Sequence, residues 1–178
     1  MKRIVIVSTG GTIEKTYDEM SGLLNNEVNV LDVMLSRLEI HGIEIERLRL
    51  MNKDSLYMSE SDHNLIAATA CRLSQSHDGV VVVHGTDRLT TSGDCIMSMI
   101  DEVDAPIVLT GAMRPYALRN TDALQNLNES LLAVQLLATL AESGGLVRTE
   151  RGWTAAALPG AGSLSTAWAA SLDRVCVG

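Results

Sequence analysis

Residues 4–13 constrain the fold most, because a short apolar run breaks off there at two glycines. Ile4–Val7 are four consecutive β-branched residues, a pattern typical of a parallel-sheet strand that is buried on both faces. Gly10 and Gly11 follow, and a glycine pair lets the backbone turn sharply without shielding the next side chain. Thr12 is then presented at the carboxyl end of a strand, where open α/β folds bind ligands. The segment predicts a nucleophile at Thr12, although an ordinary turn with a capping threonine has the same pattern.

Two further apolar runs also end in small polar residues. Val80–Val83 is the strongest candidate for a central strand, and it leads into His84-Gly85-Thr86-Asp87. Pro106–Leu109 leads into Thr110-Gly111-Ala112-Met113-Arg114-Pro115. Because the carboxyl ends of parallel strands meet at one edge of a sheet, we expect Thr86 to lie beside the first threonine across a crevice.

The segments between the apolar runs are mostly helical in their periodicity. Helices are expected over residues 29–41, 62–75, 90–103 and 122–142. Ser59 is expected to cap the second helix. Residues 44–50 alternate between charged and aliphatic side chains, which is typical of an edge strand. Residues 14–22 are expected to form a mobile loop, and residues 144–178 contain no convincing strand, with an amphipathic stretch conceivable over 165–175.

This alternation of strands and helices predicts an α/β fold with three layers, in which helices flank a mostly parallel central sheet. At 178 residues, 46% of them hydrophobic and 20% charged, the chain fits one globular domain. We expect residues 1–143 to form this domain and residues 144–178 to be an atypical tail of it.

Composition also limits the partners. The formal charge of −8 argues against nucleic acid, because no basic stripe is present to neutralise phosphates. No apolar run approaches the length of a membrane span, and the start of the chain is too soon interrupted by glycines to read as a signal peptide. The three cysteines are scattered without metal-ligand spacing, which is typical of a reduced protein. We therefore expect a soluble, cytoplasmic protein with no membrane and no nucleic-acid partner.

The strand ends carry the groups that a hydroxyl nucleophile requires, namely a second hydroxyl, oxyanion donors and anchors for a substrate. Thr86 offers the second hydroxyl, and the glycines at 11 and 85 leave backbone N–H groups open to an oxyanion. Asp87 is suited to hold an ammonium group, and Ser55 to donate to a carboxylate. The four histidines lack ligand spacing, so no metal and no other cofactor is expected, and His84 is expected to be structural. Hydrolysis of an amide or ester without a cofactor is chemically sensible at such a site.

Three motifs together resemble the bacterial L-asparaginases: Thr9-Gly10-Gly11-Thr12-Ile13, His84-Gly85-Thr86-Asp87 and Thr110-Gly111-Ala112-Met113-Arg114-Pro115. Lys53-Asp54-Ser55, Tyr17 and residues 122–127 fit the family as well, and order and spacing agree over roughly residues 1–140. The chain resembles a short, single-domain form that lacks the carboxyl-terminal domain.

The resemblance implies a role for each matching residue. Thr12 would attack the side-chain amide, Tyr17 would assist from a closing loop, and Thr86 would act beside the amide. Asp87 would hold the α-ammonium group and Ser55 the α-carboxylate. The implied substrate pocket comprises Gly11, Asp54, Ser55, Gly85, Thr86, Asp87 and Ala112. The implied reaction converts L-asparagine to L-aspartate and ammonia without a cofactor, in a homo-oligomer (a dimer or tetramer).

The chain departs from the resembled family in its lysines. The family completes a Thr-Asp-Lys relay with a lysine from a later strand and loop, whereas the lysines here are Lys2, Lys15 and Lys53. Arg148 and Arg151 cannot replace it, because a guanidinium does not lose its proton in proteins. Three interpretations follow: an amidohydrolase, active or impaired; a non-catalytic domain that binds an amino acid; and, least supported, a phosphate-binding fold without GxGxxG or a Walker lysine. The sequence does not separate asparagine from glutamine as substrate.

Overall fold

A computed structural model describes residues 1–17, 24–25, 30–99, 103–143 and 155–157 of the chain. Its strands are β1 (Lys2–Ser8), β2 (Thr16–Tyr17), β3 (Leu24–Asn25), β4 (Ile43–Arg49), β5 (Gly79–Val83), β6 (Ile107–Thr110) and β7 (Ala155–Ala157). Its α-helices are α1 (Val30–Leu35), α2 (Glu60–Ser74), α3 (Leu89–Ser98) and α4 (Ala123–Ser143). Short 3-10 turns are η1 (Thr12–Glu14), η2 (Ser55–Tyr57) and η3 (Thr86–Arg88).

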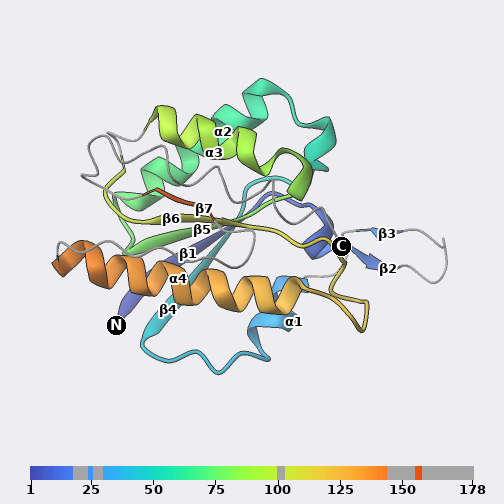
Figure 1. Ribbon diagram of the computed structural model, residues 1–178, viewed down its shortest axis with the longest axis horizontal. Helices are drawn as coiled ribbons and strands as arrows, with labels where there is room; N and C mark the ends of the chain where they lie inside the picture. Colours follow the sequence, from blue (N-terminus) through green and yellow to red (C-terminus); the bar gives the residue numbers. More distant parts are fainter. Residues whose placement is uncertain (18–23, 26–29, 100–102, 144–154, 158–178) are drawn as a thin grey trace, which may run out of the picture.

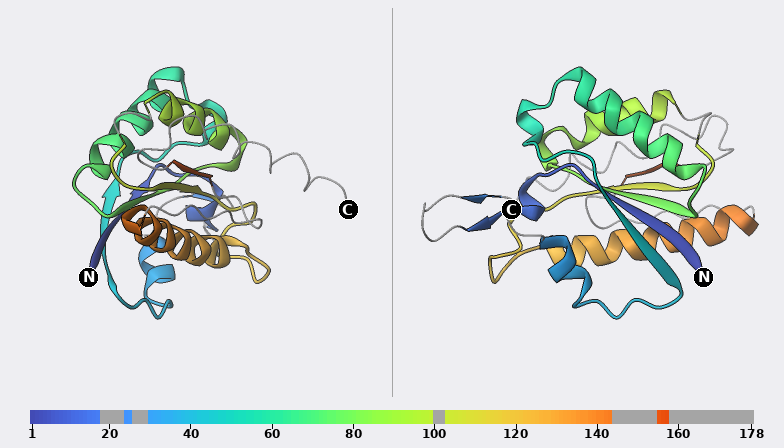
Figure 2. Two further views of the ribbon diagram at one scale, coloured as in Figure 1. Left: turned by 60° about the vertical axis from the view of Figure 1, so that its left-hand side comes forward. Right: turned by 180° about the vertical axis from the view of Figure 1, so that it is seen from behind.

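The main sheet has the strand order β4-β1-β5-β6-β7, in which the first four strands are parallel and β7 runs antiparallel to β6. Helices α2 and α3 cover one face of the sheet, and α1 and α4 cover the other (Figures 1 and 2). The prediction of a three-layer α/β fold with a mostly parallel sheet is confirmed. The edge position expected for the strand over residues 44–50 is confirmed as well, since β4 ends the sheet.

The central strands are buried on both faces, as their unbroken apolar runs predict. Alternate side chains of β1 enter two separate cores: Ile4 and Ile6 pack against α1 and α4, whereas Val5 and Val7 pack against α2 and α3. All five residues of β5 are buried, and its valines divide between the same two cores. This burial fixes the register of the parallel strands, because a shift by one residue would exchange the two faces.

The capping of α2 follows its sequence. Ser59 accepts a hydrogen bond from the backbone N–H of Asp62, and the Asp62 carboxylate accepts one from the N–H of Ser59, which completes a capping box. The predicted cap at Ser59 is confirmed. Two other helices are shorter than predicted: α1 ends at Leu35 rather than near 41, and α3 ends at Ser98 rather than at 103.

Two predictions about irregular segments are wrong. Residues 14–17 of the expected loop are not loop throughout, because Thr16–Tyr17 pairs with Leu24–Asn25 in a two-stranded ribbon, and residues 18–22 lie outside the described residues. Residues 144–178 do contain a strand, since Ala155–Ala157 pairs with Ile107–Leu109 of β6. Alanine has a low strand preference, so this strand depends on pairing with the edge of β6 rather than on its own sequence. The amphipathic stretch expected over 165–175 lies outside the described residues.

Within the described part of the chain, no helix combines the length and the apolar character needed to cross a membrane.

Candidate active site

Four loops meet where the parallel strands end. They follow β1, β4, β5 and β6, and backbone hydrogen bonds join each loop to a neighbour. The N–H of Lys53 donates to the carbonyl of Thr9 over 3.0 Å, and the N–H of His84 donates to the carbonyl of Thr110 over 2.8 Å. Thr9 in turn is tied to Val83 by its backbone N–H (3.0 Å) and by its hydroxyl (2.9 Å). The loops therefore form one continuous rim at the ligand-binding edge of the sheet.

Glycines set the spacing between these loops. A Cβ at Gly11 would lie 2.6 Å from the backbone nitrogen of Gly85, and a Cβ at Gly85 would lie 2.4 Å from Oγ of Ser55. A Cβ at Gly10 would lie 2.7 Å from the backbone nitrogen of Lys53, and a Cβ at Gly111 would lie 2.5 Å from the carbonyl oxygen of His84. Gly10 and Gly11 also have positive φ values of 100° and 90°, which other residues rarely adopt. At Gly10, Gly11 and Gly111, backbone thus approaches backbone, which only glycine permits.

The structure brings together most of the residues expected at the site. Thr12 and Thr86 directly follow the two glycines in contact, Gly11 and Gly85, and each begins a short 3-10 turn. Both threonines are half-buried, so each is partly open to solvent. The arrangement agrees with the expectation that two hydroxyls lie on adjacent loops.

Ser55 and Asp87 lie on the same side of this edge. The Oγ of Ser55 is 3.5 Å from Oδ2 of Asp87, which is the outer limit of a hydrogen bond. Ser55 is fully buried, whereas Asp87 is exposed. The Ser55 hydroxyl therefore lies beneath the surface, next to the exposed side chain of Asp87.

Glu14 holds the loop of Thr12 in place, a role that the sequence did not signal. One carboxylate oxygen accepts hydrogen bonds from the hydroxyl of Ser8 (2.6 Å) and from the N–H of Gly10 (3.2 Å). Burial raises the pKa of Glu14, although those two hydrogen bonds and the nearby Arg49 and Arg47 act in the opposite direction. Glu14 therefore fixes the turn that carries Thr12, but at a desolvation cost when ionised.

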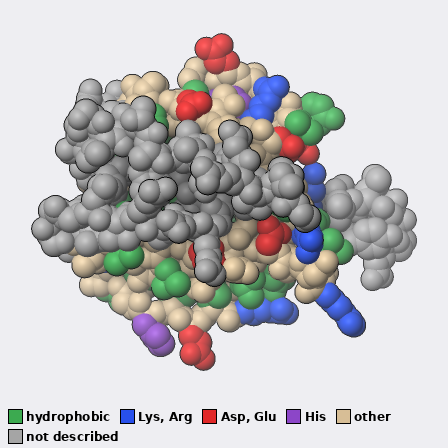
Figure 3. Space-filling view, viewed as in Figure 1, with side chains coloured by type: hydrophobic (Ala, Val, Ile, Leu, Met, Phe, Trp, Pro, Cys, Tyr) green, Lys and Arg blue, Asp and Glu red, His purple; other side chains and the backbone are tan. Residues whose placement is uncertain are grey.

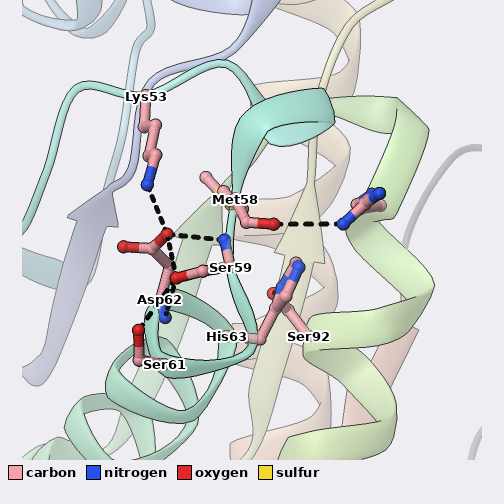
Figure 4. Close-up of polar contacts among 8 residues, drawn as sticks. Lys53, Met58, Ser59, Ser61, Asp62, His63 and Ser92 are labelled. Atoms are coloured by element: carbon pink, nitrogen blue, oxygen red, sulfur yellow. Dashed lines mark hydrogen bonds and ion pairs between the residues drawn. The ribbon is translucent and has the colours of Figure 1, made fainter.

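Two ion pairs engage the lysines near the site. Nζ of Lys15 lies 3.0 Å from Oδ2 of Asp54. Nζ of Lys53 lies 2.5 Å from Oδ2 of Asp62, and this second pair is drawn in Figure 4. The backbone N–H of Leu56 and the Lys15 ammonium lower the pKa of Asp54. The Lys15–Asp54 pair joins the loop of Thr12 to the turn of Ser55, because Asp54 also caps that turn.

Asp122 and Asn126, at the start of α4, hold the loop that contains Ala112. The Asp122 carboxylate accepts the N–H groups of Met113 and Arg114, each over 2.9 Å, and the Asn126 amide donates to the carbonyl of Gly111 over 2.8 Å. Ala112 itself packs in the core beneath α4. The Ala112 side chain is therefore not available to a ligand.

For Tyr17, the structure describes the backbone, which pairs with Leu24 in the β2–β3 ribbon. The ribbon extends from the edge at which the loops meet (Figure 1). Among the described residues, no group of three His, Cys, Asp or Glu side chains is placed to hold a metal ion.

Most of the chain is similar in sequence to known proteins. Residues 3–148 match the family described as "Asparaginase, N-terminal". An L-asparaginase of Thermococcus kodakarensis is 32% identical over 131 residues, which make up 72% of this chain and 39% of that protein. A subunit of the glutamyl-tRNA(Gln) amidotransferase of Haloquadratum walsbyi is 30% identical over 128 residues, or 69% of this chain and 28% of that protein.

A solved structure is similar as well. The structure of the thermostable L-asparaginase from Thermococcus kodakarensis superposes with a TM-score of 0.64 at 27% sequence identity, over 75% of this chain and 41% of that chain. The chain thus spans less than half the length of the relatives that it matches.

Proposed function

The chain belongs to the asparaginase family, and on this premise we propose that it is an amidohydrolase in which Thr12 attacks the side-chain amide of L-asparagine. The observation that carries the proposal is the contact between Gly11 and Gly85, which sets Thr12 and Thr86 on adjacent loops. No metal or other cofactor enters the proposed reaction.

Asparagine would be held by its two charged ends. Asp87 is exposed at the rim and would pair with the α-ammonium group, while Ser55, 3.5 Å from that carboxylate, would donate to the α-carboxylate. Gly11, Asp54, Gly85 and Ala112 would complete the pocket mainly through their backbones. The side-chain amide would then lie toward the two threonines.

The proposed reaction has two steps. The Thr12 hydroxyl oxygen forms an ester with the amide carbon, its proton passes to the leaving nitrogen, and ammonia departs. Water then hydrolyses the ester, which releases L-aspartate and restores the hydroxyl. Thr86 would orient the attacking group in each step, and Tyr17 would assist the first.

Proton transfer would limit the rate within this chain. A threonine hydroxyl is a weak nucleophile until a base takes its proton. The Nζ atoms of Lys15 and Lys53 are engaged by the carboxylates of Asp54 and Asp62 rather than by either threonine. General-base assistance is worth about 10²–10⁴-fold, so we propose slow turnover by this chain.

An ammonia-release assay tests the proposal. The purified chain is incubated with L-asparagine and with L-glutamine in parallel, and Thr12→Ala serves as the control for contaminating activity. Ammonia release from either amide that Thr12→Ala abolishes supports an amidohydrolase, and the ratio of the two rates assigns the substrate. Equal release by the variant would overturn the proposal.

A non-catalytic amino-acid-binding domain is the second candidate, and the absence of any lysine after Lys53 favours it. Calorimetry with L-aspartate separates the two. Saturable binding that Asp87→Ala weakens, in the absence of ammonia release, would support a binding domain.

We further propose that the chain assembles as a homo-oligomer, a dimer or tetramer, and acts in the cytoplasm. Hydrophobic side chains show along the face where α4 lies (Figures 1 and 3). Leu132 and Leu136, one helical turn apart on α4, are 58% and 45% exposed. Exposed apolar patches of this kind commonly mark an interface. Light scattering that gives a single 19.1 kDa species at working concentration would contradict assembly.

A further inference from the structure

A chain of buried hydrogen bonds runs behind the loop that carries Thr86. It begins at His63 on α2, whose Nδ1 lies 2.8 Å from Oγ of Ser92 on α3, and these two side chains lie together in Figure 4. The same Oγ lies 2.9 Å from Nε2 of His84, and Nδ1 of His84 lies 2.7 Å from the carbonyl oxygen of Gly85. All three side chains are at most 2% exposed. This series of hydrogen bonds thus runs from α2 through α3 to the loop that carries Thr86.

The partners fix where each proton lies. The carbonyl of Gly85 can only accept, so Nδ1 of His84 carries the proton and its Nε2, in a neutral ring, is an acceptor. The Ser92 hydroxyl must therefore donate to His84, which leaves its oxygen to accept from Nδ1–H of His63. Both histidines then have the proton on Nδ1, and every hydrogen bond points in the same direction, toward Gly85.

The environment favours neutral rings. Burial lowers the pKa of His63 and of His84, and the positive charge of Arg88 acts in the same direction on His63. Asp62, near His63, and the hydrogen bond from His84 to Gly85 act in the opposite direction, but burial is the larger effect. Arg88 itself donates to the carbonyl of Met58 over 3.0 Å. The Nε2 of His63, the outer end of the chain, is buried and has no hydrogen-bond partner among the described residues. A neutral imidazole tolerates this better than a charged one, since burying an unpaired charge costs more than burying an unpaired acceptor.

We propose that His63 and Ser92 are positioning residues for the reaction, because their directional hydrogen bonds hold His84 and thereby fix the Gly85 carbonyl at the start of the Thr86 turn. The inference rests on the proposed function for its catalytic consequence. A planar trans peptide places the Thr86 N–H opposite the Gly85 carbonyl. Fixing that carbonyl toward the buried ring therefore aims the Thr86 N–H away from it and sets the orientation of the residue that follows.

Imidazole ¹⁵N spectroscopy of the wild-type chain tests the proton assignment directly. The expected spectrum has two neutral histidines with protonated Nδ1 and bare Nε2, assigned to His63 and His84 by the loss of each signal in His63→Gln and His84→Gln. An Nε2–H tautomer or a charged ring at His84 at neutral pH would overturn the proposal.

Substitution of Ser92 tests the effect on the loop. Ser92→Ala removes the central link, Ser92→Thr retains a hydroxyl, and Ser130→Ala is the matched control. Ser130 is likewise fully buried, but its hydroxyl bonds to Leu127 O within α4. We expect Ser92→Ala to shift the amide resonances of Thr86 and Asp87 and to lower kcat about tenfold or more with KM little changed, because small misplacements of reacting groups cost that much. Ser92→Thr should restore most of the wild-type kcat and most of the wild-type positions of the Thr86 and Asp87 resonances.

The outcomes separate the two proposals. Unshifted Thr86 and Asp87 resonances in Ser92→Ala, or a kcat within twofold of Ser130→Ala, would overturn the positioning role. The protein could instead release no ammonia while Ser92→Ala still shifts the Thr86 and Asp87 resonances. That result would support the positioning role of the hydrogen bonds and overturn the proposed hydrolysis.

Discussion

Lys15 and Asp54 form an ion pair, with 3.0 Å between Nζ and Oδ2, that joins the loop of the proposed nucleophile to the turn of Ser55. Both side chains are about a third exposed, at 27% and 32%. Ion pairs of that exposure contribute little to stability, so their effect is expected mainly in the placement of the two loops.

Lys15→Met should therefore change the free energy of unfolding by less than about 1 kcal/mol and raise the KM for asparagine roughly fivefold. Asp54→Asn in the Lys15→Met background should add less to KM than it does alone, because the pair is already broken. Urea denaturation and ammonia-release kinetics on the four proteins measure both quantities. Additive effects on KM would show that the pair does not couple the loops.

Thr12→Ala and Thr86→Ala should each lower kcat by about three powers of ten or more, because residues that act as a unit lose most of their effect together. Both threonines are half-buried, so the circular dichroism spectrum should be unchanged. Thr12→Ser, which keeps a hydroxyl, is the matched variant and should retain measurable turnover. If Thr12→Ala keeps a tenth of wild-type turnover, Thr12 is not the nucleophile.

Three glycine substitutions separate backbone strain from steric contact. Gly11→Ala combines φ of +90° with a Cβ only 2.6 Å from Gly85 N, and should cost about 2–5 kcal/mol of stability. Gly42→Ala has φ of +79° but open space, and should cost about 1–2 kcal/mol. Gly93→Ala, in α3 with open space and no positive φ, should stabilise by about 1 kcal/mol. Equal losses for Gly11→Ala and Gly42→Ala would mean that the loop contact contributes nothing.

The raised pKa of Glu14 predicts a pH dependence of stability. The folded state binds the Glu14 proton more tightly than the unfolded state does, so the folded state is favoured below the unfolded-state pKa of about 4.5. That advantage is lost as pH rises through the folded-state pKa. We expect Glu14→Gln, which carries no charge, to lose less stability than wild type between pH 4.5 and pH 7 in urea denaturation. Parallel stability curves for the two proteins would contradict this.

The parallel core is predictable from the sequence because its strands are buried on both faces, and β-branched runs such as Val80–Val83 have few alternatives. The strand β7 is not predictable from the sequence, because alanine has a low strand preference and these three residues form a strand only by pairing with β6. The prediction that Thr12 and Thr86 lie on adjacent loops follows from parallel strand order. By contrast, Ser92 lies 29 residues from His63, and no local pattern marks a hydrogen bond between two helices.

The close approach of the glycine loops also determines how this edge can open. The amides of Thr9, Lys53 and His84 each donate to a different loop or strand end, so no loop can lift without breaking a neighbour's bond. These amides should therefore exchange with deuterium at one common rate, as a single cooperative unit. Opening at this edge would then break these hydrogen bonds together, rather than one loop at a time.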